Sequence, residues 1–413
     1  MGGLLAALRN RGLVALAFGH MTVDSYVGVL PVLYPLLIGR FHLDLGTIGL
    51  LSLAYTGMSS VSQPFFGLIA DRWGTRFVGG ALLWTAAWFA AIGFAPNFPV
   101  LIVAGGIAGL GSGFFHPLGA LTVRGLLSER GTNSAMSLYV SGGTFGVAMG
   151  PLIGVLVFGL LAVQGTALLL LPGLVCSAFL LVWMRANRPG SLEGAAESKR
   201  QRSSGFVPIV PLAATVLMMM SRTWTTATLQ AWVPTWYHQL GYPPWFYGGL
   251  ASTIVLCSAL GTIGCGTLAD RFGRRTVVMV ALWLSVPAVW LFVAFPGPQG
   301  FLTAALVGFL AASTSPLMLL MAQELLAARA GLASGLILGI GFMTGAVGVP
   351  ITGNVGDRFG LQAALLLQVA VVAATIPIAF LLPTERYLRR LRQAGEGERH
   401  TTSTETEEVA AGP

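Results

Sequence analysis

Asp24 and two histidines are the residues whose types and spacing could do chemistry inside an apolar segment. His20 and Asp24 stand four residues apart, so a helix would place them on one face, one turn apart. At 1.5 Å per residue along a helix, Asp24 would lie about 20 Å and His20 about 14 Å from Arg11, at the start of its apolar segment. His116 would lie about 12 Å from Arg124, at the end of its segment. Charged groups at membrane depth are costly, so each is a candidate site residue. Because imidazole titrates near physiological pH, we predict a proton-coupling site of Asp24, His20 and His116.

The same three residues allow other interpretations. Imidazole and carboxylate ligands suit a divalent cation, so His20, Asp24 and His116 are a weaker candidate for a metal site. Structural roles are also open. Asp24 could bond to nearby backbone or polar groups, and His116 could satisfy the backbone carbonyl that Pro117 leaves free.

Composition places these residues in a membrane protein. Hydrophobic residues make up 55% of the 413 and charged residues only 9%, whereas a soluble domain carries roughly 25% charged residues. So few charges cannot cover a water-facing surface, and we expect the lipid bilayer to be a partner. The formal charge of +8 comes from basic residues in short gaps between apolar runs, so we expect no nucleic-acid partner.

Apolar runs of the length that a membrane span needs, roughly 20 residues, recur along the whole chain. They predict an all-α membrane protein with twelve transmembrane helices. The runs cover approximately 12–38, 46–70, 77–95, 99–124, 134–161, 165–184, 207–236, 246–269, 277–296, 300–323, 331–355 and 361–382.

The basic residues orient these helices. With both termini cytoplasmic, 20 of the 23 Lys and Arg residues fall in cytoplasmic segments and only Arg40 and Arg358 in outer loops, Arg222 being within a helix. This bias satisfies the positive-inside rule. We therefore expect a multi-pass protein of the bacterial cytoplasmic (inner) membrane with both termini inside.

An internal repeat divides the chain into two halves. Residues 67–76 match residues 266–275 at an offset of 199, and Pro35, Pro117 and Pro151 match prolines at the same offset. We expect a six-helix bundle at 1–184, a cytosolic linker at 185–206, a second bundle at 207–384 and a disordered tail at 385–413.

Both copies of Gly-x-x-x-Asp-Arg-x-Gly resemble the signature loop of the major facilitator superfamily. The resemblance implies two pseudo-symmetric bundles with the substrate between them near the midplane. It also implies that the first, fourth, seventh and tenth helices line the cavity, which would bring His20, Asp24 and His116 to one aqueous surface. The first glycine of each loop would permit close helix contact and the last a tight turn. The loops would form a conformational latch of Gly67, Asp71, Arg72, Gly74, Arg76, Gly266, Asp270, Arg271, Gly273 and Arg275.

Two further segments narrow the resemblance. The glycines of the fifth helix, with Gly150-Pro151-x-x-Gly154, are similar to a motif of drug–proton antiporters, and small residues at this spacing favour close helix packing. We expect a helix-packing motif of Gly146, Gly150, Pro151 and Gly154. His20-x-x-x-Asp24 and residues 109–117 resemble the fosmidomycin-resistance branch.

Arg222 maps to Val23 under the repeat, next to Asp24, so the two opposite charges should lie at matching depths on facing halves. Arg222 could anchor an anionic substrate, pair in alternation with Asp24, or be a structural cation. Aromatic and amide side chains could shape the pocket around it, although such residues also serve in packing. The predicted substrate-binding residues are Arg222, Tyr34, Tyr139, Trp224, Gln230 and Trp232.

Together these features predict a secondary active transporter, a proton-coupled exporter of a small, anionic or amphiphilic drug-like compound. We expect it to act as a monomer by alternating access. The alternative is an importer or facilitator of a metabolite or divalent metal ion through the same cavity. Gly111-Ser112-Gly113 superficially resembles the serine motif of rhomboid proteases, but the duplicated layout favours transport over an enzyme. We expect no cofactor and no ATP drive, because the sequence has no phosphate-binding Gly-x-x-x-x-Gly-Lys loop.

Overall fold

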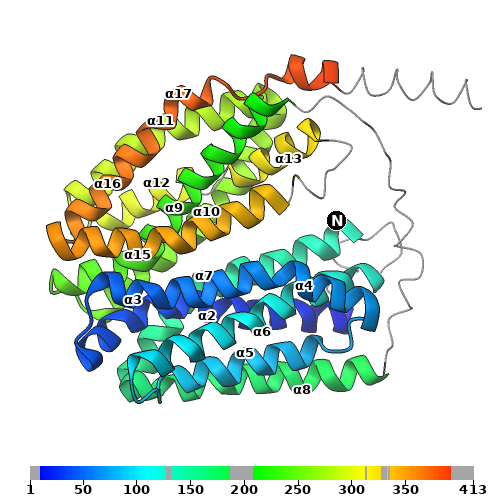
Figure 1. The fold of residues 1–413 in the computed structure, drawn as a ribbon, viewed down its shortest axis with the longest axis vertical. Coiled ribbons are helices and arrows are strands. Elements are labelled where there is room, and N and C mark those ends of the chain that lie inside the picture. Colours follow the sequence, from blue (N-terminus) through cyan, green and yellow to red (C-terminus); the bar gives the residue numbers. More distant parts are fainter. Residues whose placement is uncertain are drawn as a thin grey trace, which may run out of the picture.

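A computed structural model describes residues 10–126, 132–186, 208–311, 314–326, 333 and 335–391, and these residues are almost entirely helical (Figure 1). The helices of the first half are α2 (Arg11–Phe41), α3 (Leu45–Ser52), η1 (Leu53–Gly57), α4 (Met58–Trp73), α5 (Val78–Ile92), α6 (Phe98–Gly125), α7 (Thr132–Leu161), η3 (Ala162–Leu169) and α8 (Leu170–Ala186). Those of the second half are α9 (Ile209–Gln239), α10 (Pro244–Phe272), α11 (Arg274–Ala294), α12 (Gly300–Ala311), α13 (Ser315–Leu325), η5 (Gly335–Ile340), α15 (Gly341–Phe359), α16 (Leu361–Ala373) and α17 (Ile376–Ala379).

Side-chain caps and turn residues fix where the helices of the site begin and end. The Asn10 side chain accepts a hydrogen bond from the Leu13 amide at the start of α2, and His42 ends α2 in the left-handed conformation at φ 52°. Asp44 then caps α3 by accepting from the Thr47 amide. The turn between α2 and α3 is therefore short and well defined.

Within the described residues, seven helices are long and apolar enough to cross a membrane. The chain is thus a multi-pass membrane protein. The count of twelve spans and the cytoplasmic placement of both termini stay predictions.

The helices gather in two groups, α2 to α8 and α9 to α17, which lie one above the other in Figure 1. One hydrophobic core, which we call the shared core, contains buried residues of both groups, among them Tyr34, Leu51, Trp232 and Val349. Two further cores are each confined to one group, around Phe115 in the first and around Met318 in the second. The two groups are therefore joined by a common core at the end where α2 finishes and α3 begins.

Close approach of α7 to α2 positions the candidate site. A Cβ added at Gly146 would collide with the Met21 carbonyl, and one at Gly150 would collide with Gly28 and the Ser25 carbonyl. Gly154 is different, since a Cβ there would make only ordinary van der Waals contacts. Gly146 and Gly150 thus let the two helix backbones touch, as small residues do in membrane bundles.

Candidate functional site

The three predicted proton-coupling residues lie together between α2 and α6. The Nε2 atom of His20 is 3.2 Å from Oδ2 of Asp24, and Nε2 of His116 is 3.1 Å from Oδ1 of the same carboxylate. We call this group the His–Asp–His cluster. The side chains are 9%, 15% and 26% exposed for His20, Asp24 and His116, so the cluster is largely removed from the surface.

Backbone carbonyls orient both imidazole rings. Nδ1 of His20 is 2.8 Å from the Tyr139 carbonyl on α7, and Nδ1 of His116 is 2.7 Å from the Ser112 carbonyl one turn earlier on α6. The His116 contact is to the carbonyl of Ser112 and not to that of Gly113, which Pro117 leaves without its amide donor. Both Nε2 atoms are thereby directed at Asp24.

Two residues of α7 complete the walls of the cluster. The Tyr139 ring stacks on the His20 ring with centroids 4.2 Å apart and an angle of 23° between the planes. Gly143 leaves the space that the cluster fills, because a Cβ there would collide with Asp24 Oδ2 and His20 Nε2. The sequence predicted Tyr139 as a substrate-binding residue, whereas the structure places it against the proton-coupling candidates.

The cluster is also the group of side chains that could hold a metal ion, since its ligand atoms lie within 4.8 Å of one another. Each imidazole nevertheless contacts its own carboxylate oxygen, His116 through a hydrogen bond at 3.1 Å and His20 as an ion pair at 3.2 Å. This arrangement suits proton binding by the three side chains.

Arg222 does not pair with Asp24 in this structure. Its guanidinium donates hydrogen bonds to the carbonyls of Leu310, at 2.5 Å, and of Ala311, and the residue is only 3% exposed. Both carbonyls belong to α12, so Arg222 on α9 is bonded to another helix of its own half. The sequence analysis did not predict this contact between Arg222 and α12.

The remaining predicted pocket residues divide between packing and a cavity. Tyr34 donates to Ser52 and Trp232 to the Val349 carbonyl, and both are fully buried in the shared core. Gln230 is half-buried. Trp224 donates to Thr352 and lines a cavity between the halves. Tyr34 and Trp232 are thus packing residues in this conformation.

The cavity at Trp224 has a volume of about 580 Å³ and a mainly apolar lining. Residues of α4 from the first half and of α9, η5 and α15 from the second half surround it. They are Ser60, Val61, Pro64, Met220, Trp224, Gly339, Ile340, Met343, Thr344, Val347, Gly348 and Ile351. Its position between the halves is that expected for a substrate cavity.

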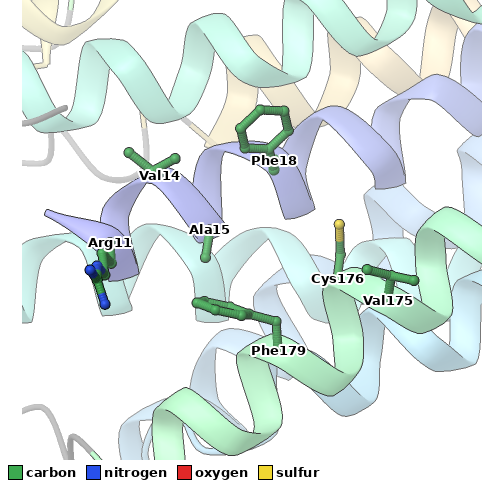
Figure 2. Close-up of a pocket in the computed structure, with 7 residues that line it drawn as sticks. All are labelled: Arg11, Val14, Ala15, Phe18, Val175, Cys176 and Phe179. Carbon is green, nitrogen blue, oxygen red and sulfur yellow. The ribbon is translucent and has the colours of Figure 1, made fainter. Parts of the chain in front are cut away.

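A second cavity, shown in Figure 2, lies between α2 and α8 and has a volume of about 530 Å³. Its lining residues from α2, Arg11, Val14, Ala15 and Phe18, lie on the face of that helix opposite to His20 and Asp24. Phe18 and Phe179 are about half exposed at its mouth. This cavity is therefore separate from the His–Asp–His cluster.

The first signature loop forms the predicted turn without the predicted close contact. Gly74 ends α4 at φ 73°, a conformation that favours glycine. Arg72 and Arg76 lie over the rings of Trp73 and Phe77, at 5.7 and 4.7 Å from the ring centroids. The side chain of Asp71 lies outside the described part of the structure. No described heavy atom lies within 4 Å of where a Gly67 Cβ would be, so close packing at Gly67 stays a prediction for another conformation.

The second signature loop also forms the predicted turn, and its bonds stay within its own half. Gly273 adopts φ 83°, Gly266 again has no close described neighbour, and the exposed Asp270 and Arg271 form no ion pair with a described residue. Arg275 donates to the Phe380 carbonyl.

Arg274, which the sequence analysis did not single out, makes the ion pairs of this loop. Its Nη2 atom lies 2.9 Å from Oε1 of Glu324, and its Nε atom lies 3.3 Å from Oε1 of Glu385. The doubled arginine of the second copy, where the first has Thr75-Arg76, was the available signal. All three charged residues belong to the second half, so this network does not bridge the halves.

The structure reveals a charged contact between the halves that the sequence analysis missed. The Asp357 carboxylate at the end of α15 accepts hydrogen bonds from the amides of Leu45, at 2.7 Å, and Gly46, at 2.8 Å. Residues 353–360 repeat the pattern Gly-x-x-x-Asp-Arg-Phe-Gly, which was the signal in the sequence. An acidic side chain at a helix N-terminus is favourable, and here it comes from the opposite half.

The sequence model of the Major Facilitator Superfamily matches residues 16–265 and 214–411, which together span nearly the whole chain. The chain belongs to the Major Facilitator Superfamily. Membership in this family of transporters points to a transporter and not an enzyme.

Relatives within the superfamily support the narrower resemblance. The chain is 30% identical to the uncharacterized MFS-type transporter YfnC of Bacillus subtilis, over 91% of this chain and 94% of the relative. It is 25% identical to the fosmidomycin resistance protein of Escherichia coli, over 84% of this chain and 87% of the relative.

A solved structure supports the fold. The crystal structure of a bacterial homolog to the human lysosomal transporter Spinster, in an inward-facing and occupied conformation, matches with a TM-score of 0.77. The match covers 89% of this chain and 95% of that one at 16% identity, so it bears on the fold alone.

Proposed function

We propose that this superfamily member is a proton-coupled exporter of a small, anionic or amphiphilic compound that works by alternating access. The observation that carries the proposal is the single Asp24 carboxylate held between the two imidazoles of His20 and His116. Ionisable groups inside membrane helices mark proton and substrate pathways, and imidazole exchanges protons near physiological pH. Twelve spans, two six-helix domains, both termini inside a bacterial inner membrane and a monomeric state complete the proposal.

The cavity at Trp224 supports a substrate of the proposed class. It is lined by residues of both halves and is mainly apolar, with hydroxyl groups from Ser60 and Thr344 at its wall. An apolar cavity with few polar groups suits an amphiphilic compound. The relative named for fosmidomycin resistance makes fosmidomycin the first compound to test.

The signature loops provide the proposed latch. In the conformation seen, Arg274 forms an ion pair with Glu324 of its own half. Asp357 joins the two halves at the opposite end of the molecule. Alternating access would exchange the contact at Asp357 for contacts of the signature loops. The shared core at the Asp357 end supports an arrangement closed there.

Transport by reconstituted protein tests the proposed function. Proteoliposomes loaded with fosmidomycin should exchange it against a pH gradient, and an ionophore that collapses the gradient should stop net transport. Asp24→Asn should lose this exchange, and Asp44→Asn is its matched control, because it makes the same chemical change at a helix cap where asparagine serves equally well. Counterflow of equal rate with and without a pH gradient would instead establish a facilitator.

A further inference from the structure

The cavity between α2 and α8 combines one charged side chain with an apolar wall. Arg11 is exposed at the start of α2, and the other lining residues are aliphatic or aromatic apart from Cys176. Figure 2 shows Arg11 at one end of the cavity and Cys176 and Val175 at the other. Seven residues separate Arg11 from Phe18, so the wall extends about 10 Å along α2. The cavity is therefore an apolar groove with a cation at one end.

Contacts on both sides of the groove make it part of the packing of the two helices. On the side of Arg11, a Cβ added at Gly12 would collide with the Trp183 ring, so α8 touches α2 there. On the other side, Oγ1 of Thr22 lies 3.6 Å from Sγ of Cys176. Between these contacts α2 carries Ala15, whose side chain is a single methyl group. Because the helices already touch on both sides, they cannot close the hollow at Ala15 by moving together.

The residues at the two ends of the groove show how it lies in the bilayer. Tryptophan and basic residues gather where transmembrane helices leave the hydrocarbon, and Trp183 lies against the first turn of α2 beside Arg11. Further along, Phe18 and Val175 are more than half exposed on helices of a membrane protein. The groove thus runs from the level of the lipid headgroups into the hydrocarbon.

The charge of Arg11 is available to a ligand. Within the described residues Arg11 takes part in no ion pair. A guanidinium binds phosphate oxygens through two parallel hydrogen bonds, and a basic residue near the membrane surface attracts anionic lipids. In phosphatidylcholine a quaternary ammonium offsets the charge of the phosphate, whereas phosphatidylglycerol has no such group. A lipid with a net negative charge therefore complements Arg11 best.

We propose that this cavity binds one anionic glycerophospholipid, with its phosphate on Arg11 and one acyl chain along Ala15 and Phe179. Its volume of about 530 Å³ lies within the range of about 300–1,000 Å³ that is usual for small-molecule sites. The inference does not depend on the proposed function. The lipid would contact α2 on the face opposite to Asp24, and so would lie outside the His–Asp–His cluster.

Lipid binding to the purified full-length protein, stripped of lipid in detergent, tests the proposal. Native mass spectrometry would count the bound molecules of phosphatidylglycerol, of phosphatidylcholine and of glycerophosphoglycerol, which is the headgroup without acyl chains. We expect one tightly bound phosphatidylglycerol, phosphatidylcholine bound roughly tenfold more weakly, and no binding of the free headgroup. Equal affinity for the two lipids, or tight binding of the free headgroup, would overturn the proposal.

Arg11→Gln tests the position of the phosphate. It should weaken phosphatidylglycerol binding roughly tenfold, the factor that one charge-assisted hydrogen bond supplies, and remove the preference over phosphatidylcholine. Arg185→Gln is the matched control, because Arg185 is exposed in the last turn of α8 and does not line the cavity. Wild-type binding by Arg11→Gln, or an equal loss in both variants, would show that the groove is not the site.

Ala15→Phe tests the position of the acyl chain, since the larger ring fills the hollow while Arg11 stays. Binding of both lipids should weaken roughly tenfold, because burial of the chain drives it. Val175→Trp narrows the groove from an exposed position, and melting without lipid identifies which filled variant is folded. Undiminished binding by a folded filled variant would contradict the proposal. So would a lipid-free dimer of the wild type that the filled variant cannot form, since a second copy would then occupy the groove.

Discussion

At the scale of single residues, the arrangement around Asp24 was largely predictable. Asp24 is an acid inside an apolar run, and the four-residue spacing to His20 fixed their common face. The contact to His116 followed only from the family resemblance, because 92 residues separate it from Asp24. The roles of Gly143 and of the Tyr139 carbonyl could not be predicted, since they depend on how α7 approaches α2.

Gly143→Ala should damage the cluster at the residue scale. The new methyl group would collide with Asp24 and His20, and overpacking of this kind costs about 1–3 kcal/mol. We expect proton-driven transport to fall roughly tenfold, which corresponds to about 1.4 kcal/mol. Initial rates in proteoliposomes would measure the fall.

Gly159→Ala is the matched control for this change. It lies on the same helix, and a Cβ there would meet no described atom within 4 Å. Equal transport by Gly143→Ala and Gly159→Ala would show that the close approach at the cluster is unimportant.

At the scale of elements, helix packing explains both the successes and the errors of the sequence-based predictions. The glycines of α7 do contact α2, because their spacing repeats on one helix face. Gly67 and Gly266 have no close described neighbour in this conformation. A glycine motif in a sequence does not indicate which conformation brings its partner helix near. The α12 carbonyls that Arg222 contacts lie 88 and 89 positions from it in the sequence, so no local pattern could identify this partner.

Arg222→Leu tests whether the arginine stabilises the contact between α9 and α12. The variant removes two charge-assisted hydrogen bonds to carbonyls, each worth about 1.5–3 kcal/mol. We expect a clearly lower Tm in detergent, in the absence of any substrate. An unchanged Tm would show that Arg222 has no structural role and would favour a role in substrate binding alone.

At the scale of the whole molecule, the two halves share a core at one end and keep separate cores elsewhere. The internal repeat predicted two related halves, but not which end holds them together. In the sequence, Asp357 lies 312 positions from Leu45 and 311 positions from Gly46, so no local pattern could identify these two partners. The third copy of the signature pattern marked Asp357 without revealing its role.

Asp357→Asn should favour opening of the molecule at this end. Asparagine can accept only one of the two amide hydrogen bonds through its single carbonyl and loses the charge, so we expect a shift of roughly tenfold toward the open form. Spin labels at Gly39 and Phe359, both exposed, would report the distance between the halves. Asp44→Asn changes a cap within one half and should leave the distance distribution as it is; an equal shift in both variants would contradict this role for Asp357.

Proton coupling through Asp24 is tested most directly by transport in proteoliposomes that contain Asp24→Asn. The variant should insert into the membrane as the wild type does, yet a pH gradient should no longer drive fosmidomycin movement, because the carboxylate between the two imidazoles is gone. Full exchange driven by the pH gradient in this variant would contradict the central role given to Asp24.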